Sequence, residues 1–370
     1  MSLTNTESFL REELESRKET GNLRALPSPL IGVDFCSNDY LGFAHYPPTE
    51  LTNLVQGKSG SSSSRLIAGN LQELIDTETY LSKAHQSEAA LLFNSGYAAN
   101  TGLLSAIGDK HSLFIYDEYC HASIIDGMRL SFAKRVKFKH NDIDSLRAAL
   151  ITSKAERRFI VIESVYSMDG DAVDVESIMT MAREFDAELI VDEAHAIGVS
   201  GPENKGLFHG KNVFAKVLTF GKALGLHGAA VLGSQTLIDF LVNFSRPFIY
   251  TTAMPPDQAK KIMQAYEAVK NTDRTIQLHS RIVKYKQLVT ELGLQKCMSL
   301  NEGPIQVLML PGNQAAKEFA STLSKSGLDV KAILSPTVPE GKERLRISLH
   351  AFNEDSEIEF LLKKIHELKS

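Results

Sequence analysis

An acid and a lysine each follow a run of apolar residues. Asp192 ends the apolar part of AELIVDEAHAIGVSG at 187–201, and Lys222 follows KVLTF at 216–220. Pyridoxal phosphate (PLP) requires both groups, because a lysine binds it as a Schiff base and an acid pairs with its pyridinium nitrogen. The pair therefore predicts a PLP site, although each residue alone has an ordinary interpretation, as an acidic helix cap and a surface lysine.

The same acidic run has a second interpretation. LIVDEAH at 189–195 has the form of the acidic strand of a DEAH-type helicase, which also needs a phosphate loop of the form G-x-x-x-x-G-K-[ST]. Gly57, Lys58 and Ser59 fit the end of such a loop, but Thr52 stands where its first glycine is required. The net charge of −5 also argues against the basic track of a nucleic-acid motor. The PLP hypothesis is preferred, and no nucleic-acid partner is expected.

Length and composition indicate an ordinary globular protein. The chain has 370 residues, of which 43% are hydrophobic and 23% charged, so it can bury a sizeable core. No apolar run approaches the roughly 20 residues of a membrane-spanning helix, and the polar N-terminus lacks the apolar core of a signal peptide. The three cysteines form no CxxC pair and are expected to be reduced thiols. We therefore expect a cytoplasmic protein without a membrane partner.

From about residue 70 onward, apolar segments of strand length alternate with longer segments. Strands are expected at 90–93, 113–116, 135–138, 158–163, 188–192, 216–220 and 229–233. Continuous apolar strands separated by helix-length segments indicate an α/β fold with a mostly parallel sheet that is buried on both faces. We assign residues 38–253 to this large, PLP-binding domain.

The two ends of the chain follow other patterns. Residues 1–37 are expected to form an N-terminal arm with an amphipathic helix at 6–19. Residues 254–370 are expected to form a smaller α+β domain, which opens with a helical region that runs to about 292. Its further elements are expected as strands at 305–310, 328–334 and 344–349 and a helix at 354–368.

Two predicted strand ends carry groups suited to phosphate. Ligands in open α/β sheets bind at the carboxyl ends of the strands. Thr219 ends one such strand and could donate its hydroxyl, whereas Ser95, Gly96 and Tyr97 stand between a strand and a helix. The free N–H groups of a helix N-terminus bind phosphate well, and glycine allows a close approach. A plain strand-to-helix turn is the ordinary alternative.

Three further strand ends carry groups suited to the cofactor ring. His195 and Ser167 could each reach the phenolic oxygen, and the ring of His121 could stack on the pyridine face. Each residue alone would be unremarkable. The specific signal is that several strand ends deliver such groups, together with Asp192 and Lys222, toward one edge of the predicted sheet.

Nine motifs, in their order along the chain, resemble the α-oxoamine synthase family of PLP enzymes, which has the aspartate-aminotransferase-like (type I) fold. The motifs are SNDYLG (37–42), NSGYAAN (94–100), HAS (121–123), HND (140–142), SVYSMDGD (164–171), VDEAHAIGVSG (191–201), TFGKALGLHGAAVLGS (219–234), RPFIYTTAMPP (246–256) and PTVP (336–339). The resemblance covers most of the chain. It implies PLP, an amino acid and an acyl thioester as substrates, a homodimer and no metal.

The resemblance also implies a role for individual residues. It makes Lys222, His121 and Asp192 catalytic, with Lys222 as the acid and base at the amino-acid α-carbon. The cofactor-binding set that it implies is Ser95, Gly96, Tyr97, His121, Ser167, Asp192, His195, Thr219 and Lys222, with Thr252, or its neighbour Thr251, reaching the phosphate from a neighbouring subunit. The substrate residues that it implies are Arg24, Asn38 and Thr337.

Two motifs carry the expected activity, and the chain departs from the family at Leu334 and at Gly60-Ser61-Ser62-Ser63, where the family usually has G-S-G-G. HGAAVLGS and FIYTTAMPP resemble the members that condense L-alanine with a pimeloyl thioester, on CoA or an acyl carrier protein, to 8-amino-7-oxononanoate in biotin synthesis. Leu334 stands where the family commonly has an arginine that can hold the amino-acid carboxylate, and Arg346 is another cation that could do so. The alternatives are a related synthase with a different amino acid or acyl thioester, and a PLP-binding protein without synthase activity.

Overall fold

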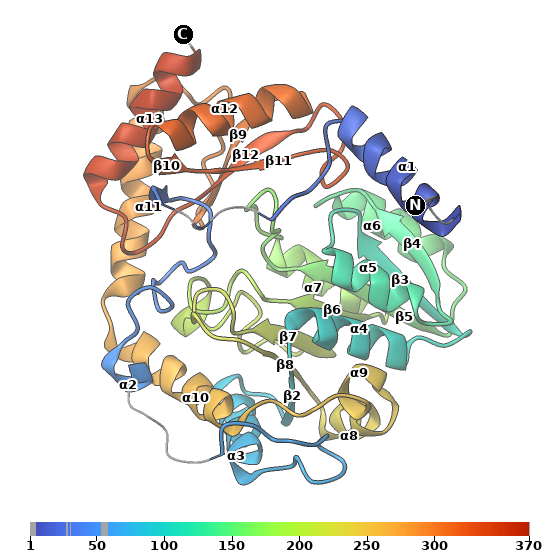
Figure 1. The fold of residues 1–370 in the computed structure, drawn as a ribbon. Helices are drawn as coiled ribbons and strands as arrows, with labels where there is room; N and C mark the ends of the chain where they lie inside the picture. Colours follow the sequence, from blue (N-terminus) through green and yellow to red (C-terminus); the bar gives the residue numbers. More distant parts are fainter. Residues whose placement is uncertain (1–4, 27–28, 30, 53–57, 370) are drawn as a thin grey trace. The chain divides into compact units, whose positions relative to one another are not determined.

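The computed structural model describes residues 5–26, 29, 31–52 and 58–369 (Figure 1). It divides the chain into two compact units, each of which is described by itself. Unit 1 comprises residues 1–37, 168–170 and 278–370, and unit 2 comprises residues 38–167 and 171–277. No helix among these described residues is long and apolar enough to span a membrane.

Unit 2 is built on a seven-stranded sheet with the order β2-β8-β7-β6-β5-β3-β4 (Figure 1). Its strands are β2 (Ala89–Phe93), β3 (Ser112–Asp117), β4 (Lys134–Phe138), β5 (Arg157–Glu163), β6 (Glu188–Asp192), β7 (Ala215–Thr219) and β8 (Ala229–Gly233). All neighbours are parallel except β8, which is antiparallel to both β7 and β2. Every strand expected between residues 90 and 233 is therefore present, in a mostly parallel sheet.

Side chains alternate between two hydrophobic cores along each central strand. In β5, Phe159 and Val161 belong to one core, whereas Ile160 and Ile162 belong to the other. Successive side chains of a strand point to opposite faces, so the continuous apolar run reflects a sheet that is covered on both sides. The edge strand β4 is exposed at its first four positions. Its lysines and arginine protect an edge that would otherwise invite pairing with another chain.

Helices of unit 2 connect and cover these strands. They are α2 (Thr49–Thr52), α3 (Gln72–Ala84), α4 (Gly96–Ile107), α5 (Ala122–Arg129), α6 (Ile143–Thr152), α7 (Val175–Glu184), the 3₁₀ turn η1 (Pro202–Asn204), α8 (Gln235–Phe244), α9 (Arg246–Ile249) and α10 (Pro256–Asn271). Several begin with a capping side chain: Asp142, Asp174 and Ser234 each accept the N–H group three residues ahead. Such caps satisfy N–H groups that the helix itself leaves without a partner.

Unit 1 contains two small sheets. β1 (Val33–Asp34) pairs with β10 (Leu328–Asp329), and β11 (Lys331–Ile333), β12 (Arg344–Ser348) and β9 (Ile305–Met309) form an antiparallel sheet. Its helices are α1 (Asn5–Glu19), most of α11 (Arg274–Glu291), α12 (Asn313–Lys325) and α13 (Asp355–Lys369). The strand expected at 328–334 is thus wrong as a single element, because it splits at Val330 between the two sheets.

The boundaries of these units compare directly with the expected domains. The first boundary coincides, at residues 37 and 38. The expected smaller domain begins at residue 254, whereas compactness places α10 in unit 2. The helical region expected from 254 to 292 is interrupted between α10 and α11, after Asn271. The three-part division of the chain stays a prediction.

Candidate active site

The carboxyl ends of several strands lie level with one another in the sheet of unit 2. Glu163, the last residue of β5, is the register partner of Asp192, which ends β6. Thr219 ends β7 and Phe93 ends β2, and both pair with Ala229 of β8. The residues that follow these strand ends therefore meet at one edge, which is where ligands bind in open α/β sheets.

Asp192 is buried at this edge and held by two hydrogen bonds. Its Oδ1 accepts the backbone N–H of Ala194 at 2.9 Å, and its Oδ2 accepts the side-chain amide of Asn100 at 2.7 Å. Asn100 also donates to the hydroxyl of Ser123 at 2.9 Å. With 6% of Asp192 exposed, the carboxylate has a fixed orientation, as is required of an acid that must meet one ring nitrogen.

The turn after β2 leaves two N–H groups available at the start of α4. Ser95 caps this helix, since its Oγ accepts the N–H of Ala98 at 3.1 Å and its carbonyl accepts that of Ala99 at 2.9 Å. The N–H groups of Gly96 and Tyr97 come first in the helix and have no carbonyl one turn earlier to bond. Such a helix start is an anion-binding site.

Thr219 lies against this helix start. A Cβ atom on Gly96 would come within 2.4 Å of Thr219 Cγ2, so the approach requires glycine. The Thr219 hydroxyl is buried and has no hydrogen-bond partner among the described residues. Burying a hydroxyl without a partner costs free energy, and a bound phosphate oxygen would supply that partner. The residues present therefore fit the phosphate end of PLP.

His121 caps α5, and its side chain is exposed. Its Nδ1 accepts the backbone N–H of Ser123 at 3.2 Å and lies 2.8 Å from the hydroxyl of the same residue. Desolvation by the surrounding protein lowers the pKa of His121; Asp192 raises this pKa and Lys222 lowers it. A lowered pKa and an accepting Nδ1 both favour the neutral ring. A neutral, exposed ring is suited to stacking on a pyridinium.

His195 is fixed by a short chain of polar side chains. Its Nδ1 lies 2.8 Å from the hydroxyl of Tyr40, and that hydroxyl lies 3.1 Å from Oδ1 of Asn38. Both Tyr40 and His195 are buried, at 0% and 5% exposure. The bond at Nδ1 orients the ring. The structure thus brings Asn38 to the same set of residues as His195.

Lys222 lies in the loop between β7 and β8. Its carbonyl accepts the N–H of Gly225 at 2.9 Å, and Gly225 has a φ of +62°. A Cβ there would lie 2.4 Å from the backbone nitrogen of Ala44, so a glycine is needed for both reasons. Lys222 is half-buried, and its charge influences both His121 and Glu163.

Ser167 lies in the turn that follows β5 and is 7% exposed. Its backbone N–H donates to the carboxyl group of Glu163, and the N–H of His121 donates to Glu163 Oε1 at 2.6 Å. Burial raises the pKa of Glu163 to about 8, and the nearby charge of Asp192 raises it too, whereas Lys222 and the two N–H groups lower it. The charges of Asp192 and Lys222 therefore act on Glu163, which lies at the same edge of the sheet.

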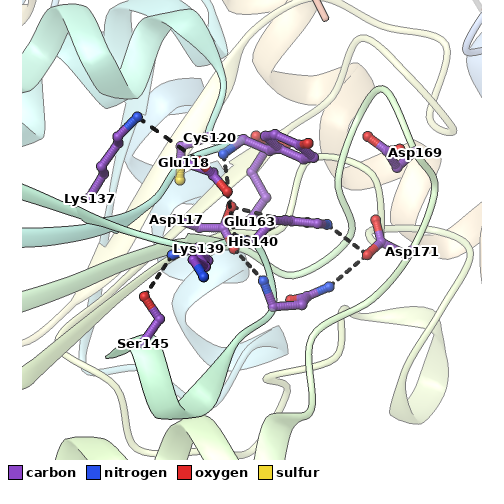
Figure 2. Close-up of polar contacts among 12 residues, drawn as sticks. Asp117, Glu118, Cys120, Lys137, Lys139, His140, Ser145, Glu163, Asp169 and Asp171 are labelled. Carbon is purple, nitrogen blue, oxygen red and sulfur yellow. Dashed lines mark hydrogen bonds and ion pairs between the residues drawn. The ribbon is translucent and has the colours of Figure 1, made fainter. Parts of the chain in front are cut away.

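A second charged cluster holds the turn that contains Ser167 (Figure 2). His140 Nδ1 lies 2.9 Å from Asp117 Oδ1, and its Nε2 lies 2.8 Å from Asp171 Oδ2. Burial lowers the pKa of His140, but the hydrogen bonds and charges of the two carboxylates prevail and raise it to about 10. The backbone N–H of Tyr166 donates to the carbonyl of Asp171 at 2.9 Å, which closes the turn.

Two predicted substrate residues lie together in unit 1. Nη2 of Arg24 lies 3.4 Å from Oγ1 of Thr337. Both line a cavity of about 500 Å³, to which Arg17, Lys317 and Lys331 also contribute. The cavity is therefore bordered by several cationic side chains.

Thr252 lies in unit 2 and is exposed. Its carbonyl accepts the side-chain amide of Asn94 at 2.9 Å, and the same amide lies 3.1 Å from Thr251 Oγ1. Asn94 directly follows β2, so this segment lies near the helix start that carries Gly96. The expected reach of Thr252 to a neighbouring subunit stays a prediction.

The sequence analysis did not single out three residues of this edge. Tyr40 and Asn100 stand inside the motifs SNDYLG and NSGYAAN, so their place in those motifs was the available signal. Glu163 had no comparable signal, because a strand that ends in an acid is common. Its register with Asp192 and its bonds to two backbone N–H groups become visible only in the fold.

The fold and the edge together define a PLP-dependent enzyme of fold type I: a mostly parallel sheet presents a helix start suited to phosphate, a fixed acid and a lysine at its carboxyl edge. The chain belongs to the aminotransferase class I and II family, whose model matches residues 31–365. It is 36% identical over 368 residues to the 8-amino-7-oxononanoate synthase of Chromohalobacter salexigens. This alignment covers 96% of this chain and 94% of the relative.

Solved structures agree with this assignment. Serine palmitoyltransferase from S. paucimobilis with a bound PLP–myriocin aldimine has the same fold, with a TM-score of 0.88, 23% identity and coverage of 99% of this chain and 98% of that one. The 8-amino-7-oxononanoate synthase of Francisella tularensis gives a TM-score of 0.77 and 28% identity over 91% of this chain and 98% of that one. The predicted family, fold class, PLP dependence and enzyme class are confirmed. The roles of individual residues stay predictions.

Proposed function

We propose that this protein uses PLP to condense L-alanine with a pimeloyl thioester, releasing the thiol and CO₂ and giving 8-amino-7-oxononanoate for biotin synthesis. The observation that carries the proposal is the carboxyl edge of the unit 2 sheet, where Asp192, His121 and Lys222 interact beside the pair formed by Gly96 and Thr219. Relatives named 8-amino-7-oxononanoate synthase, at 36% identity over nearly the whole chain, support the pair of substrates.

The residues of this edge divide the work among themselves. When bound, PLP supplies an electron sink that stabilises negative charge at the amino-acid α-carbon. Asp192, held by Asn100 and Ala194, keeps a proton on the pyridine nitrogen, which strengthens that sink. Lys222 takes the proton from the α-carbon of alanine. The neutral ring of His121 covers one face of the site and keeps water away.

The reaction balances without a further reagent. The α-carbon of alanine forms a bond to the carbonyl carbon of the thioester, and the thiolate leaves. The original carboxylate of alanine departs as CO₂, and Lys222 returns a proton to the same carbon. Lys222 therefore acts twice at the α-carbon, first as a base and then as an acid.

The cationic cavity of unit 1 supports an acyl chain that ends in a carboxylate. Arg24 and Thr337 lie 3.4 Å apart in this cavity of about 500 Å³, which is the size of an ordinary small-molecule pocket. A pimeloyl chain carries a carboxylate at its far end, which an arginine can bind through two parallel hydrogen bonds. A plain fatty acyl chain would gain nothing from these cations.

Arg346 is the residue to which we assign the carboxylate of alanine. Leu334 cannot bind an anion, whereas Arg346 lies on β12, is 6% exposed and donates to Ser348 Oγ at 2.9 Å. We further propose a cytoplasmic homodimer, in which Thr252 of one subunit serves the phosphate of the other.

The test is thiol release by the purified, PLP-loaded protein. Glycine, L-alanine and L-serine are each combined with acetyl-CoA, pimeloyl-CoA, pimeloyl carrier protein and palmitoyl-CoA. We expect L-alanine with a pimeloyl donor to exceed every other pair by about tenfold or more in kcat/KM, about 1.4 kcal/mol of discrimination. A maximum at another pair would identify a related synthase. Bound PLP without thiol release from any pair would indicate a binding protein.

A further inference from the structure

Glu163 is a buried acid at the carboxyl edge that has no part in the reaction proposed above. It is 2% exposed and ends β5 directly beside Asp192 on β6. Taking a carboxyl group out of water is costly unless hydrogen bonds compensate. A second acid next to Asp192 adds repulsion to that cost. The hydrogen bonds of Glu163 must therefore stabilise the folded protein by more than the burial of its carboxyl group costs.

Two backbone N–H groups from different segments donate to this one carboxyl group. One belongs to His121, the cap of α5, and donates to Oε1 at 2.6 Å. The other belongs to Ser167 in the turn after β5. Figure 2 shows Glu163 beside the segment from Asp117 to Cys120 that leads into His121. A buried carboxyl group that loses such partners is left unsatisfied, which costs more than an ordinary hydrogen bond contributes. The carboxyl group therefore ties the two segments to the end of β5.

We infer that Glu163 is a positioning residue, which fixes His121 and Ser167 at a set place relative to Asp192. The identity of the ligand that these residues meet rests on the proposed function. The tie itself is a property of the protein alone. The two segments carry the imidazole of His121, which would cover PLP, and the hydroxyl of Ser167, which would meet its phenolic oxygen. Releasing both segments should therefore loosen the binding of PLP, whereas Lys222 would still attach it.

Glu193 offers a matched control. It follows Asp192, is 0% exposed, and accepts the backbone N–H groups of Phe208 at 2.7 Å and Leu207 at 3.1 Å. The loop that it holds carries none of the predicted cofactor residues, and the lysine that acts on it is Lys216. Glu193 thus resembles Glu163 in being buried and in accepting two backbone N–H groups. It differs because the loop that it holds contributes no residue to the proposed cofactor site.

The first measurement needs no cofactor. Amide hydrogen exchange is followed in the cofactor-free full chain for the wild type, Glu163→Gln, Glu163→Ala and Glu193→Gln. We expect exchange at His121 and Ser167 to rise about tenfold or more in Glu163→Ala and less in Glu163→Gln, which keeps one acceptor oxygen. In Glu193→Gln, the exchange rate should instead rise at Leu207 and Phe208. Wild-type exchange at both His121 and Ser167 in Glu163→Ala would overturn the tie.

The second measurement uses the PLP-loaded protein. In Glu163→Gln, the visible circular dichroism of bound PLP should fall about twofold, and the dissociation constant of PLP should rise about tenfold, with covalent attachment to Lys222 retained. Glu193→Gln should leave both unchanged at a similar melting temperature. Unchanged dichroism and affinity in a Glu163 variant with faster exchange would overturn the positioning role. A wild type that binds no PLP would overturn the proposed function, and exchange alone would then decide the tie.

Discussion

Two charged clusters of unit 2 use the same residue types in opposite ways. The proposed reaction centre consists of His121, Asp192 and Lys222, and the His140 cluster consists of Asp117, His140, Asn141 and Asp171. Both ring nitrogens of His140 face carboxylates, whereas the exposed ring of His121 is bonded through Nδ1 to Ser123. The pKa of His140 is raised to about 10, and that of His121 is lowered. The pairing of the ring therefore decides whether a histidine is a structural cation or a neutral surface for a ligand.

The comparison extends to buried hydroxyl groups and acids. In the reaction centre and beside it, the hydroxyl of Thr219 lacks a partner among the described residues, and Glu163 is held next to Asp192, where burial and the charge of Asp192 raise its pKa. Such groups store unfavourable free energy that a ligand can relieve. In the His140 cluster, Asn141 adds two further donors to the carboxylates, at 2.9 Å from Asp117 and 2.6 Å from Asp171. The His140 cluster is thus held mainly by hydrogen bonds among its own members, although Oδ1 of Asp171 is buried without a partner among the described residues.

Removing Lys222 should produce the largest effect. In Lys222→Ala, thiol release from L-alanine and pimeloyl-CoA should fall about 10⁴-fold, because both the base and the covalent attachment of PLP are lost. Borohydride reduction followed by mass spectrometry should find PLP attached to the wild type and not to the variant. Lys216→Met is the control, since Lys216 lies near the other end of β7, is 4% exposed and donates to the carbonyl of His85 at 3.2 Å. It should lower the melting temperature and keep the attachment.

The His140 cluster should show itself in the pH dependence of stability. The folded pKa of His140 is about 10, above its ordinary value of 6.5. Its contribution is therefore fully present below pH 6.5 and is lost as the pH rises through 10. We expect the free energy of unfolding to fall by about 2 to 4 kcal/mol across this range, in addition to any change shared with other groups. Urea denaturation at a series of pH values measures the fall.

His140→Gln should remove this part of the pH dependence. His111→Gln is the matched control, because the His111 side chain is 44% exposed and lies 2.9 Å from Glu156 in a surface pair, which contributes little. The difference between wild type and variant cancels the contribution of Glu163, whose raised pKa makes the folded state less stable as the pH rises from 4.5 through 8. An identical slope in His140→Gln and the wild type would contradict the structural role.

The contrast between the clusters also marks what the sequence could predict. Asp192 and Lys222 were found because each follows an apolar run that became a buried strand, and the parallel order of β5, β6 and β7 then brought their ends together. Glu163 follows the same rule but was missed, since its bonds reach segments far from it in the sequence. The break of the strand at Val330 was missed because a continuous apolar run does not reveal a change of partner strand.

The fit between Gly96 and Thr219 should have the next largest effect. Gly96→Ala places a Cβ 2.4 Å from Thr219 Cγ2, so the dissociation constant of PLP should rise about 30-fold. Thr219→Ser removes that methyl group and keeps the hydroxyl. The double variant should therefore bind PLP within about threefold of Thr219→Ser alone, which a double-mutant cycle by fluorescence titration would detect. Additive losses would show that the methyl contact is not the cause.

The smallest expected effect concerns the hydrogen bond by which Tyr40 orients His195. Tyr40→Phe removes the hydroxyl that lies 2.8 Å from Nδ1 of His195, so kcat/KM should fall about fivefold, in line with the loss of one buried hydrogen bond. Tyr285→Phe is the control, because Tyr285 is also 0% exposed but its hydroxyl has no partner among the described residues. It should leave kcat/KM unchanged and the stability equal or higher. Equal losses in both variants would show that general repacking, and not the orientation of His195, limits the reaction.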